Sequence, residues 1–171
     1  MSFTRSFFII LLLCVAFTSS AQNKKFTPAS ETQLALKYYR NGEYEKAAEI
    51  YQRLYFTNRS YSYYRYFMNS LIKLEKYDKA EELAKEQVKA YKNNLNYLVD
   101  LGYVYTLQGN LSKAKSTFNS AIRKLGPNQH RIIQLANAFM AKRLYEYAEE
   151  TYLEGRKLMK GNYGFNIEMA Q

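Results

Sequence analysis

Apolar and polar positions repeat between about residue 30 and residue 160 at the spacing of helices that bury one side. The runs between turn-forming residues are about 12 to 16 residues long, which suits helices better than strands. Turns are marked by pairs such as Asn41-Gly42 and Gly126-Pro127, because Gly and Asn tolerate positive φ and Pro cannot continue a helix. The pattern predicts helices at residues 30–41, 44–57, 61–74, 77–92, 94–108, 111–125, 129–142 and 145–160.

A small residue recurs along these helices at a nearly constant interval. The alanines of this series follow one another at a spacing of roughly 34 residues, and they are Ala47, Ala80, Ala114 and Ala148. A fixed period of this size is typical of stacked repeats, in which each unit buries its apolar face only against its neighbours. The sequence therefore predicts an all-α protein of four repeated helix pairs.

The start of the first helix carries two alternative signals. Thr27-Pro28 offers an N-terminal cap followed by a proline in the first turn, and Ser30 with Gln33 offers a capping box further along the chain. The sequence alone leaves both open.

The third unit carries a set of residues at fixed offsets. They are Leu98, Leu101, Gly102, Tyr105, Gly109, Ala114, Phe118, Ala121 and Pro127. This set resembles the tetratricopeptide repeat, and the other units keep parts of it in phase. Units two and four depart from it at the turn inside the unit, where Glu75 and Arg143 replace glycine.

The resemblance covers about residues 28–161 and implies a right-handed α-solenoid of four stacked helix–turn–helix repeats. We expect these repeats at about 28–60, 61–94, 95–128 and 129–161. Residues 162–171 resemble the start of a further repeat helix, because Met169-Ala170 fall one repeat period after Leu135-Ala136. This suggests a fragment of a longer repeat protein; the alternative is a short protein that self-associates through its C-terminal end.

The physical role of several repeat positions can be stated without the family. The small residues Gly102, Ala114 and Ala121 allow two antiparallel helices to approach closely, whereas Tyr105 and Phe118 are large enough to fill the space between units. The chain has 18 tyrosines, and their helical spacing predicts that most of them pack between repeats.

The N-terminus has the pattern of a secretory signal peptide. Arg5 is followed by an uninterrupted apolar run from Phe7 to Phe17, and then by Ser19-Ser20-Ala21. We expect cleavage after Ala21, a short tail at 22–29, and export to a bacterial periplasm or cell envelope. An uncleaved membrane anchor and lipidation of Cys14, the single cysteine, are the alternatives.

Charge and candidate chemistry point to binding and not to catalysis. The net charge is +10, with cations spread along the helices. Export makes a nucleic-acid partner unexpected, and no segment after the signal peptide is apolar enough to span a membrane permanently. His130 is the only histidine and is expected at the surface, just after Pro127. No catalytic, cofactor or metal site is predicted, so we do not expect an enzyme.

The resemblance also implies where a partner binds. In tetratricopeptide repeats the first helix of each unit lines a concave groove that holds a protein or peptide. Matching positions are Leu36, Tyr39, Arg40, Arg65, Asn69, Ile72, Lys73, Tyr103, Thr106, Leu107, Ile133, Asn137 and Met140. The sequence thus suggests an exported, non-catalytic interaction scaffold in an envelope-associated complex. The alternative is a sensory or regulatory input module of a larger signalling protein.

Overall fold

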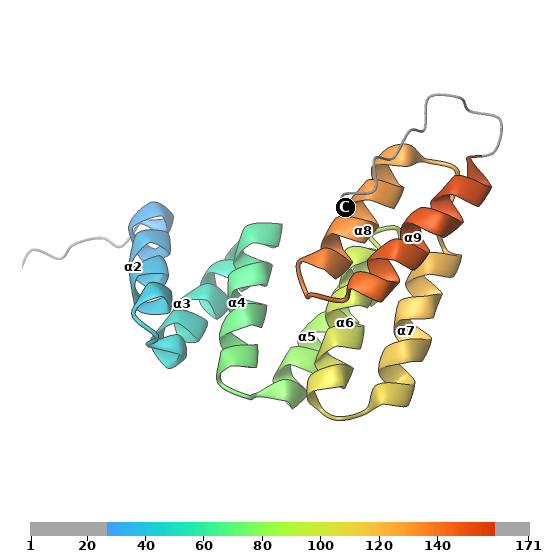
Figure 1. The fold of residues 1–171 in the computed structure, drawn as a ribbon. Coiled ribbons are helices and arrows are strands. Elements are labelled where there is room, and N and C mark those ends of the chain that lie inside the picture. The colour runs from blue at the N-terminus through green and yellow to red at the C-terminus, as the bar shows by residue number, and fades with distance from the viewer. Residues whose placement is uncertain (1–26, 160–171) are drawn as a thin grey trace, which may run out of the picture.

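The computed structural model describes residues 27–159, which form eight helices and no strand (Figure 1). These helices are α2 (Pro28–Arg40), α3 (Tyr44–Thr57), α4 (Tyr61–Lys73), α5 (Tyr77–Ala90), α6 (Asn96–Leu107), α7 (Leu111–Arg123), α8 (Gln129–Met140) and α9 (Tyr145–Leu158). Every helix expected from the sequence is present, and each end lies within two residues of its predicted position. The predicted signal peptide at 1–21 and the predicted further helix at 162–171 lie outside the described residues. Within 27–159, no helix has the length and apolarity needed to cross a membrane.

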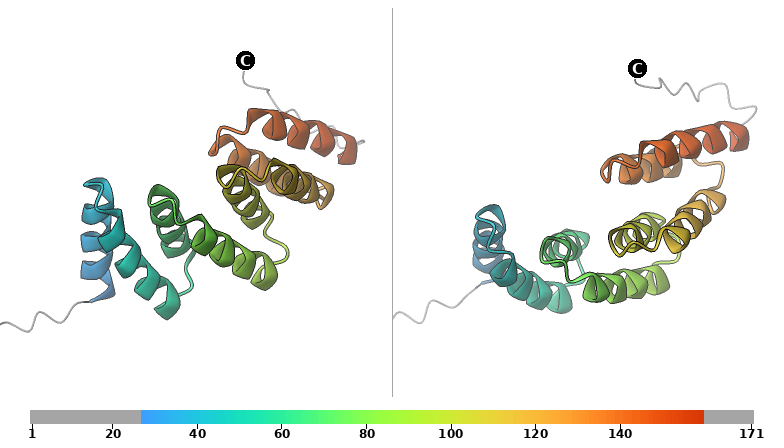
Figure 2. Two further views of the ribbon diagram at one scale, coloured as in Figure 1. Left: turned by 90° about the horizontal axis from the view of Figure 1, so that it is seen from below. Right: turned by 60° about the horizontal axis from the view of Figure 1, so that its bottom comes forward.

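The helices stack in sequence order as an α-solenoid. Each unit is an antiparallel pair, and equivalent helices of the last two units also touch, since α6 contacts α8 and α7 contacts α9. Figure 2 shows the helices following an arc, with α4 and α6 toward its inner side and α3, α5 and α7 toward its outer side. The recurring alanines Ala47, Ala80, Ala114 and Ala148 are all buried.

The close approach of helices within units depends on small residues, as expected. A Cβ atom added to Gly102 of α6 would overlap the Phe118 ring of α7, and one added to Gly155 would overlap Ile132. Phe118 in turn reaches the fourth unit, where its ring centroid lies 5.5 Å from that of Phe139 and 4.7 Å from that of Tyr147. Large aromatic residues therefore fill the space between units.

The turns inside the four units share one backbone conformation. Gly42 and Gly109 have φ values of +80° and +77°, which glycine adopts without steric cost. Glu75 and Arg143 occupy the same place in units two and four with φ values of 55° and 60°. The departure from the repeat pattern is thus a change of residue and not a change of geometry.

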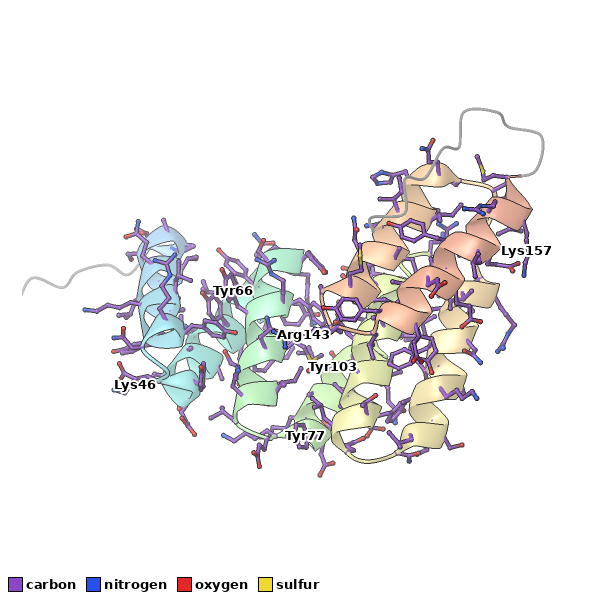
Figure 3. The ribbon with its side chains drawn as sticks, viewed as in Figure 1. Lys46, Tyr66, Tyr77, Tyr103, Arg143 and Lys157 are labelled. Atoms are coloured by element: carbon purple, nitrogen blue, oxygen red, sulfur yellow. The ribbon has the colours of Figure 1, made fainter. Side chains whose placement is uncertain are left out.

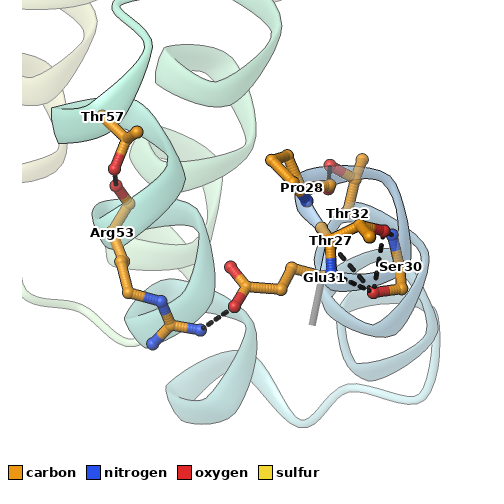
Figure 4. Close-up of polar contacts among 7 residues, drawn as sticks. All are labelled: Thr27, Pro28, Ser30, Glu31, Thr32, Arg53 and Thr57. Atoms are coloured by element: carbon orange, nitrogen blue, oxygen red, sulfur yellow. Dashed lines mark hydrogen bonds and ion pairs between the residues drawn. The ribbon is translucent and has the colours of Figure 1, made fainter. Parts of the chain in front are cut away.

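The first helix begins at the Thr27 cap, so the alternative start at Ser30 is wrong. The Ser30 amide donates to Thr27 Oγ1 at 3.2 Å, and the Thr27 amide donates to Ser30 Oγ at 3.0 Å (Figure 4). Pro28 occupies the first turn, where its missing N–H has no helical partner to lose. An ion pair of 3.2 Å between Glu31 and Arg53 then joins α2 to α3.

Candidate interaction groove

A hollow of about 530 Å³ lies among α4, α6 and α8, which are the first helices of units two, three and four. We call this hollow the central groove. Its polar lining residues are Arg65, Asn69, Asn96, Asp100, His130, Gln134, Asn137 and Lys142, and Tyr61, Tyr64, Met68, Ile133, Ala138 and Ala141 complete it.

Helical periodicity explains which side chains reach this groove. In α4, Tyr64, Met68 and Leu71 are buried, and Arg65 and Asn69 lie one turn apart on the adjoining side. In α8 the core residues are Ile132, Leu135, Ala136 and Phe139, and Ile133 and Asn137 form the corresponding pair. The same face of α4 and of α8 is therefore directed into the groove, whereas α6 contributes Asn96 and Asp100 from a different register.

The floor of the central groove is held by Asp100. Its Oδ1 atom lies 3.0 Å from the Lys142 ammonium, and its Oδ2 atom accepts a hydrogen bond of 3.0 Å from the Tyr64 hydroxyl. The Lys142 ammonium also lies 5.0 Å from the centre of the Tyr103 ring. Burial first, and then the nearby Asp100 charge, raise the pKa of Tyr64 well above 10, so Tyr64 remains a proton donor to Asp100.

An aromatic cluster lies between α2 and α4, beside Arg65. Tyr66 projects from α4 toward the first unit (Figure 3), where its ring stacks on Tyr51 at a centroid distance of 4.9 Å. The Tyr39 ring meets Tyr66 edge-on at 5.4 Å, and burial raises the Tyr39 pKa. The Arg65 guanidinium lies 5.2 Å from the Tyr66 ring centre. Arg65 is therefore positioned by an aromatic face and not by a carboxylate.

The sequence-derived binding residues fall into three groups. Arg65, Asn69, Ile133 and Asn137 line the central groove. Leu107 lines a separate shallow hollow beside Gln108 and the turn within unit two. The remaining predicted residues do not line the central groove and stay predictions for a longer contact surface. They are Leu36, Tyr39, Arg40, Ile72, Lys73, Tyr103, Thr106 and Met140.

Ten groove residues were missed by the sequence analysis: the polar residues Asn96, Asp100, His130, Gln134 and Lys142, and also Tyr61, Tyr64, Met68, Ala138 and Ala141. His130 is exposed in the first turn of α8, where the sequence placed it, but it also borders the groove. Asp100 had one sequence signal, because it is the only acidic residue between Glu86 and Glu146.

The chemistry of the groove suits binding. Asn69 and Asn137 each offer a donor and an acceptor, as a peptide backbone does, and Arg65 can donate two parallel hydrogen bonds to a carboxylate. Within residues 27–159, no group of three or more His, Cys, Asp or Glu side chains is arranged to hold a metal ion.

Solved structures with a similar fold include a tetratricopeptide repeat protein from Parabacteroides merdae, at 13% sequence identity and a TM-score of 0.51. The match covers 78% of this chain and 54% of that one. The crystal structure of MamA matches at 14% identity and a TM-score of 0.50, over 82% of this chain and 83% of that one. No protein-family model matches the chain, and no curated protein matches it significantly. The similarity shows the fold, an α-solenoid of tetratricopeptide-like repeats.

Proposed function

We propose that this chain, an α-solenoid of tetratricopeptide-like repeats, is an exported, non-catalytic scaffold that binds a polypeptide partner in its central groove. The partner would belong to an envelope-associated complex. One observation carries the proposal: a single hollow of about 530 Å³ receives polar side chains from the first helices of three successive units.

This arrangement suits an extended polypeptide. Asn69, Asp100 and Asn137 come from three consecutive units, so a chain laid across the groove meets a polar group at each unit. Side-chain amides can satisfy both the N–H and the C=O of a peptide group, whose burial without a partner is costly. A bound chain would therefore keep its backbone hydrogen-bonded.

The electrostatics favour an acidic side chain of the partner near Arg65. Asp100 and Lys142 neutralise each other at 3.0 Å, whereas Arg65 forms no ion pair with any carboxylate of residues 27–159. Its guanidinium already rests against the Tyr66 ring, which lowers the conformational entropy that binding would cost. Arg65 is thus the strongest candidate for a charged anchor.

Export rests on the order of charged, apolar and small residues at positions 1–21. Mass spectrometry of the protein expressed in a bacterial host with a periplasm tests it. We expect a mature chain that begins at Gln22, and an intact Met1 on a cytosolic species would contradict export.

The groove is tested by photo-crosslinking at two exposed apolar positions of the fourth unit. A photoreactive phenylalanine analogue replaces Ile133, which lines the groove, or Leu153 on the second helix. We expect covalent polypeptide adducts in the envelope from the Ile133 position alone. Adducts from Leu153 with none from Ile133 would place the partner on the outer face.

A binding assay with the captured partner extends the test. Arg65→Ala and Tyr103→Ala are each expected to weaken binding by about 1 kcal/mol or more, since aromatic and arginine residues are the usual anchors of such contacts. Lys115→Ala, an exposed change on α7, serves as the matched control. If the control weakens binding as much as Arg65→Ala does, the groove is not the site.

A further inference from the structure

Cations gather at the edge of the solenoid where one unit connects to the next. Because the helices alternate in direction, the turns between units lie at one edge and the turns within units at the opposite edge (Figure 1). We define the basic edge as the cations at or beside the turns that follow α3, α5 and α7, namely Arg59, Lys89, Lys92, Arg123, Lys124 and Arg131.

Within residues 27–159, little acidic charge opposes the basic edge. Residues 101–145 contain no Asp or Glu, and the preceding acid, Asp100, is paired with Lys142. The Arg59 guanidinium lies 4.0 Å from the Glu86 carboxylate, and both side chains are at least half exposed, so this ion pair is weak. None of the other five cations pairs with a carboxylate of residues 27–159.

Three of these cations converge on a hollow. Lys89, Lys92 and Arg131 line a depression of about 780 Å³ together with Tyr91. The Arg131 guanidinium is held there by a hydrogen bond of 3.2 Å to the Asn93 carbonyl. This link joins the fourth unit to the turn after the second and restrains the Arg131 side chain beside the hollow.

Aromatic rings lie beside the cations on the same edge. Phe56, Tyr61 and Tyr91 are between 44% and 51% exposed. The Phe56 ring packs against the buried Tyr55 ring at a centroid distance of 5.5 Å. The rings of Tyr61 and Tyr91 pack against the buried Tyr97 ring at 6.2 Å and 5.7 Å.

Arg59 joins the charged and aromatic parts of this edge. Its guanidinium lies 4.8 Å from the ring centres of both Tyr55 and Phe56 and donates a hydrogen bond of 3.1 Å to the Tyr55 hydroxyl. The edge thus combines fixed charge with fixed aromatic surface, which is the composition of protein-binding hot spots.

Helix dipoles account for only part of this charge. Lys89 and Arg123 lie in the last turns of α5 and α7, where a cation is favourable. Arg131 lies in the first turn of α8, where a cation is unfavourable, and Lys92 lies in a turn outside any helix. Helix stability therefore does not explain why these two positions carry positive charge.

We propose that the basic edge is a second docking surface, for an acidic polypeptide segment that carries aromatic or apolar side chains between its carboxylates. The half-exposed rings of Phe56, Tyr61 and Tyr91 offer apolar contacts beside the cations, which a polypeptide that carries both acidic and apolar side chains can meet. The edge adjoins the central groove, and Gln134 lines both hollows. The chain would then hold two polypeptides at once.

A random copolymer of Glu and Tyr, labelled with a fluorophore, is the probe for the full chain. We expect saturable binding that weakens steeply as salt rises from about 50 to 300 mM, because screening shortens the reach of the charges. The variant Lys89→Gln/Lys92→Gln/Arg131→Gln is expected to lose at least about tenfold in affinity. Lys46→Gln/Lys79→Gln/Lys113→Gln removes the same charge near the opposite edge and should change the affinity less than about twofold.

A separate variant tests the aromatic rings of the basic edge. If the attraction were purely electrostatic, removing a ring would not change the affinity for the copolymer. Phe56→Ala is expected to weaken copolymer binding by about threefold or more without shifting the urea midpoint, because Phe56 is half exposed. The loss in the Lys89/Lys92/Arg131 variant is expected to be equally large in an Arg65→Ala background, because the central groove, which can also hold an acidic segment, is a separate site. This result separates the basic edge from the groove proposed above.

Three outcomes would overturn the proposal. Equal losses in the two triple variants would show that only net charge attracts the probe. Tighter binding of a single-stranded oligonucleotide than of the copolymer, lost in the Lys89/Lys92/Arg131 variant, would assign the edge to nucleic acid. Binding to phosphatidylglycerol vesicles without binding to the copolymer would assign it to an anionic lipid surface.

Discussion

The Asp100 carboxylate lies 3.0 Å from the Lys142 ammonium, across the space between α6 and the turn that follows α8. It also accepts a hydrogen bond from Tyr64 of α4. One side chain of the third unit is therefore bonded to the second and fourth units at the floor of the central groove. Both members of the ion pair are less than one-fifth exposed, so their contact is only partly screened by water.

We expect Asp100→Asn to lower the free energy of unfolding by about 2 kcal/mol, because it leaves the Lys142 charge largely buried without a carboxylate. Urea denaturation measures the change. Glu82→Gln removes an exposed acid that pairs with no cation of residues 27–159, and it should cost less than about 0.5 kcal/mol. Equal losses in the two variants would mean that Asp100 does not hold the units together.

The turns within units two and four offer stabilising substitutions. Glu75→Gly and Arg143→Gly should each raise the free energy of unfolding by about 0.5–1 kcal/mol, because a Cβ atom at φ near +60° is sterically unfavourable. Gly109→Ala should lower it by about 1 kcal/mol. A Cβ atom at Gly109 would meet nothing within 4 Å, so this loss measures the backbone alone.

Thermal midpoints of the three variants provide the measurement. An increase for Glu75→Gly and Arg143→Gly with a decrease for Gly109→Ala is the expected pattern. If Glu75→Gly and Arg143→Gly also lower the midpoint, glycine stabilises the unfolded chain through its conformational entropy by more than it relieves backbone strain in the folded turns.

The fold was predictable because its signals are local and repeated. Each recurring alanine is expected where two helices touch, and Ala47, Ala80 and Ala114 are buried in the core. Gly42 and Gly109 mark turns that need positive φ, and the repeat period locates the same turns at Glu75 and Arg143. Four copies of one pattern in phase therefore fixed the helix positions closely.

The groove was less predictable because it depends on how successive units rotate. Repeat register predicted that Arg65, Asn69, Ile133 and Asn137 lie on the inner faces of their helices, and these four residues line the hollow. Lys142 follows the end of α8, whereas its partner Asp100 lies in α6 of the preceding unit. The curvature of the solenoid brings these residues together, and the repeat period carries no information on that curvature.

Tyr51 provides a test of a buried polar group. Its side chain is fully buried, and its hydroxyl has no hydrogen-bond partner among residues 27–159. Tyr51→Phe should therefore raise the free energy of unfolding by about 1 kcal/mol at neutral pH, since a buried hydroxyl without a partner is costly. The matched change Tyr64→Phe should lower it by about 1–2 kcal/mol, because Tyr64 donates to Asp100. Destabilisation by Tyr51→Phe would show that its hydroxyl is satisfied by an internal water.

The stability of the protein at alkaline pH depends on the buried tyrosine hydroxyls of the same core. Burial, and then neighbouring tyrosines, raise the pKa of Tyr51 and of Tyr97 to about 12, against 10.0 for an exposed tyrosine. The folded chain thus holds these two protons more tightly than the unfolded chain does. Their stabilising effect is complete below pH 10 and is lost as pH rises from 10 toward 12.

We therefore expect the free energy of unfolding, measured by urea denaturation between pH 8 and pH 12, to fall in the upper half of that range. Tyr51→Phe removes one of the buried titrating phenols and should make the fall clearly smaller, while Tyr97 continues to contribute. Tyr145→Phe removes a phenol that is 63% exposed and should leave the fall unchanged. If the Tyr51 and Tyr145 variants lose stability with the same pH dependence, the Tyr51 hydroxyl titrates as an exposed one does, and the core at the first unit is open to water.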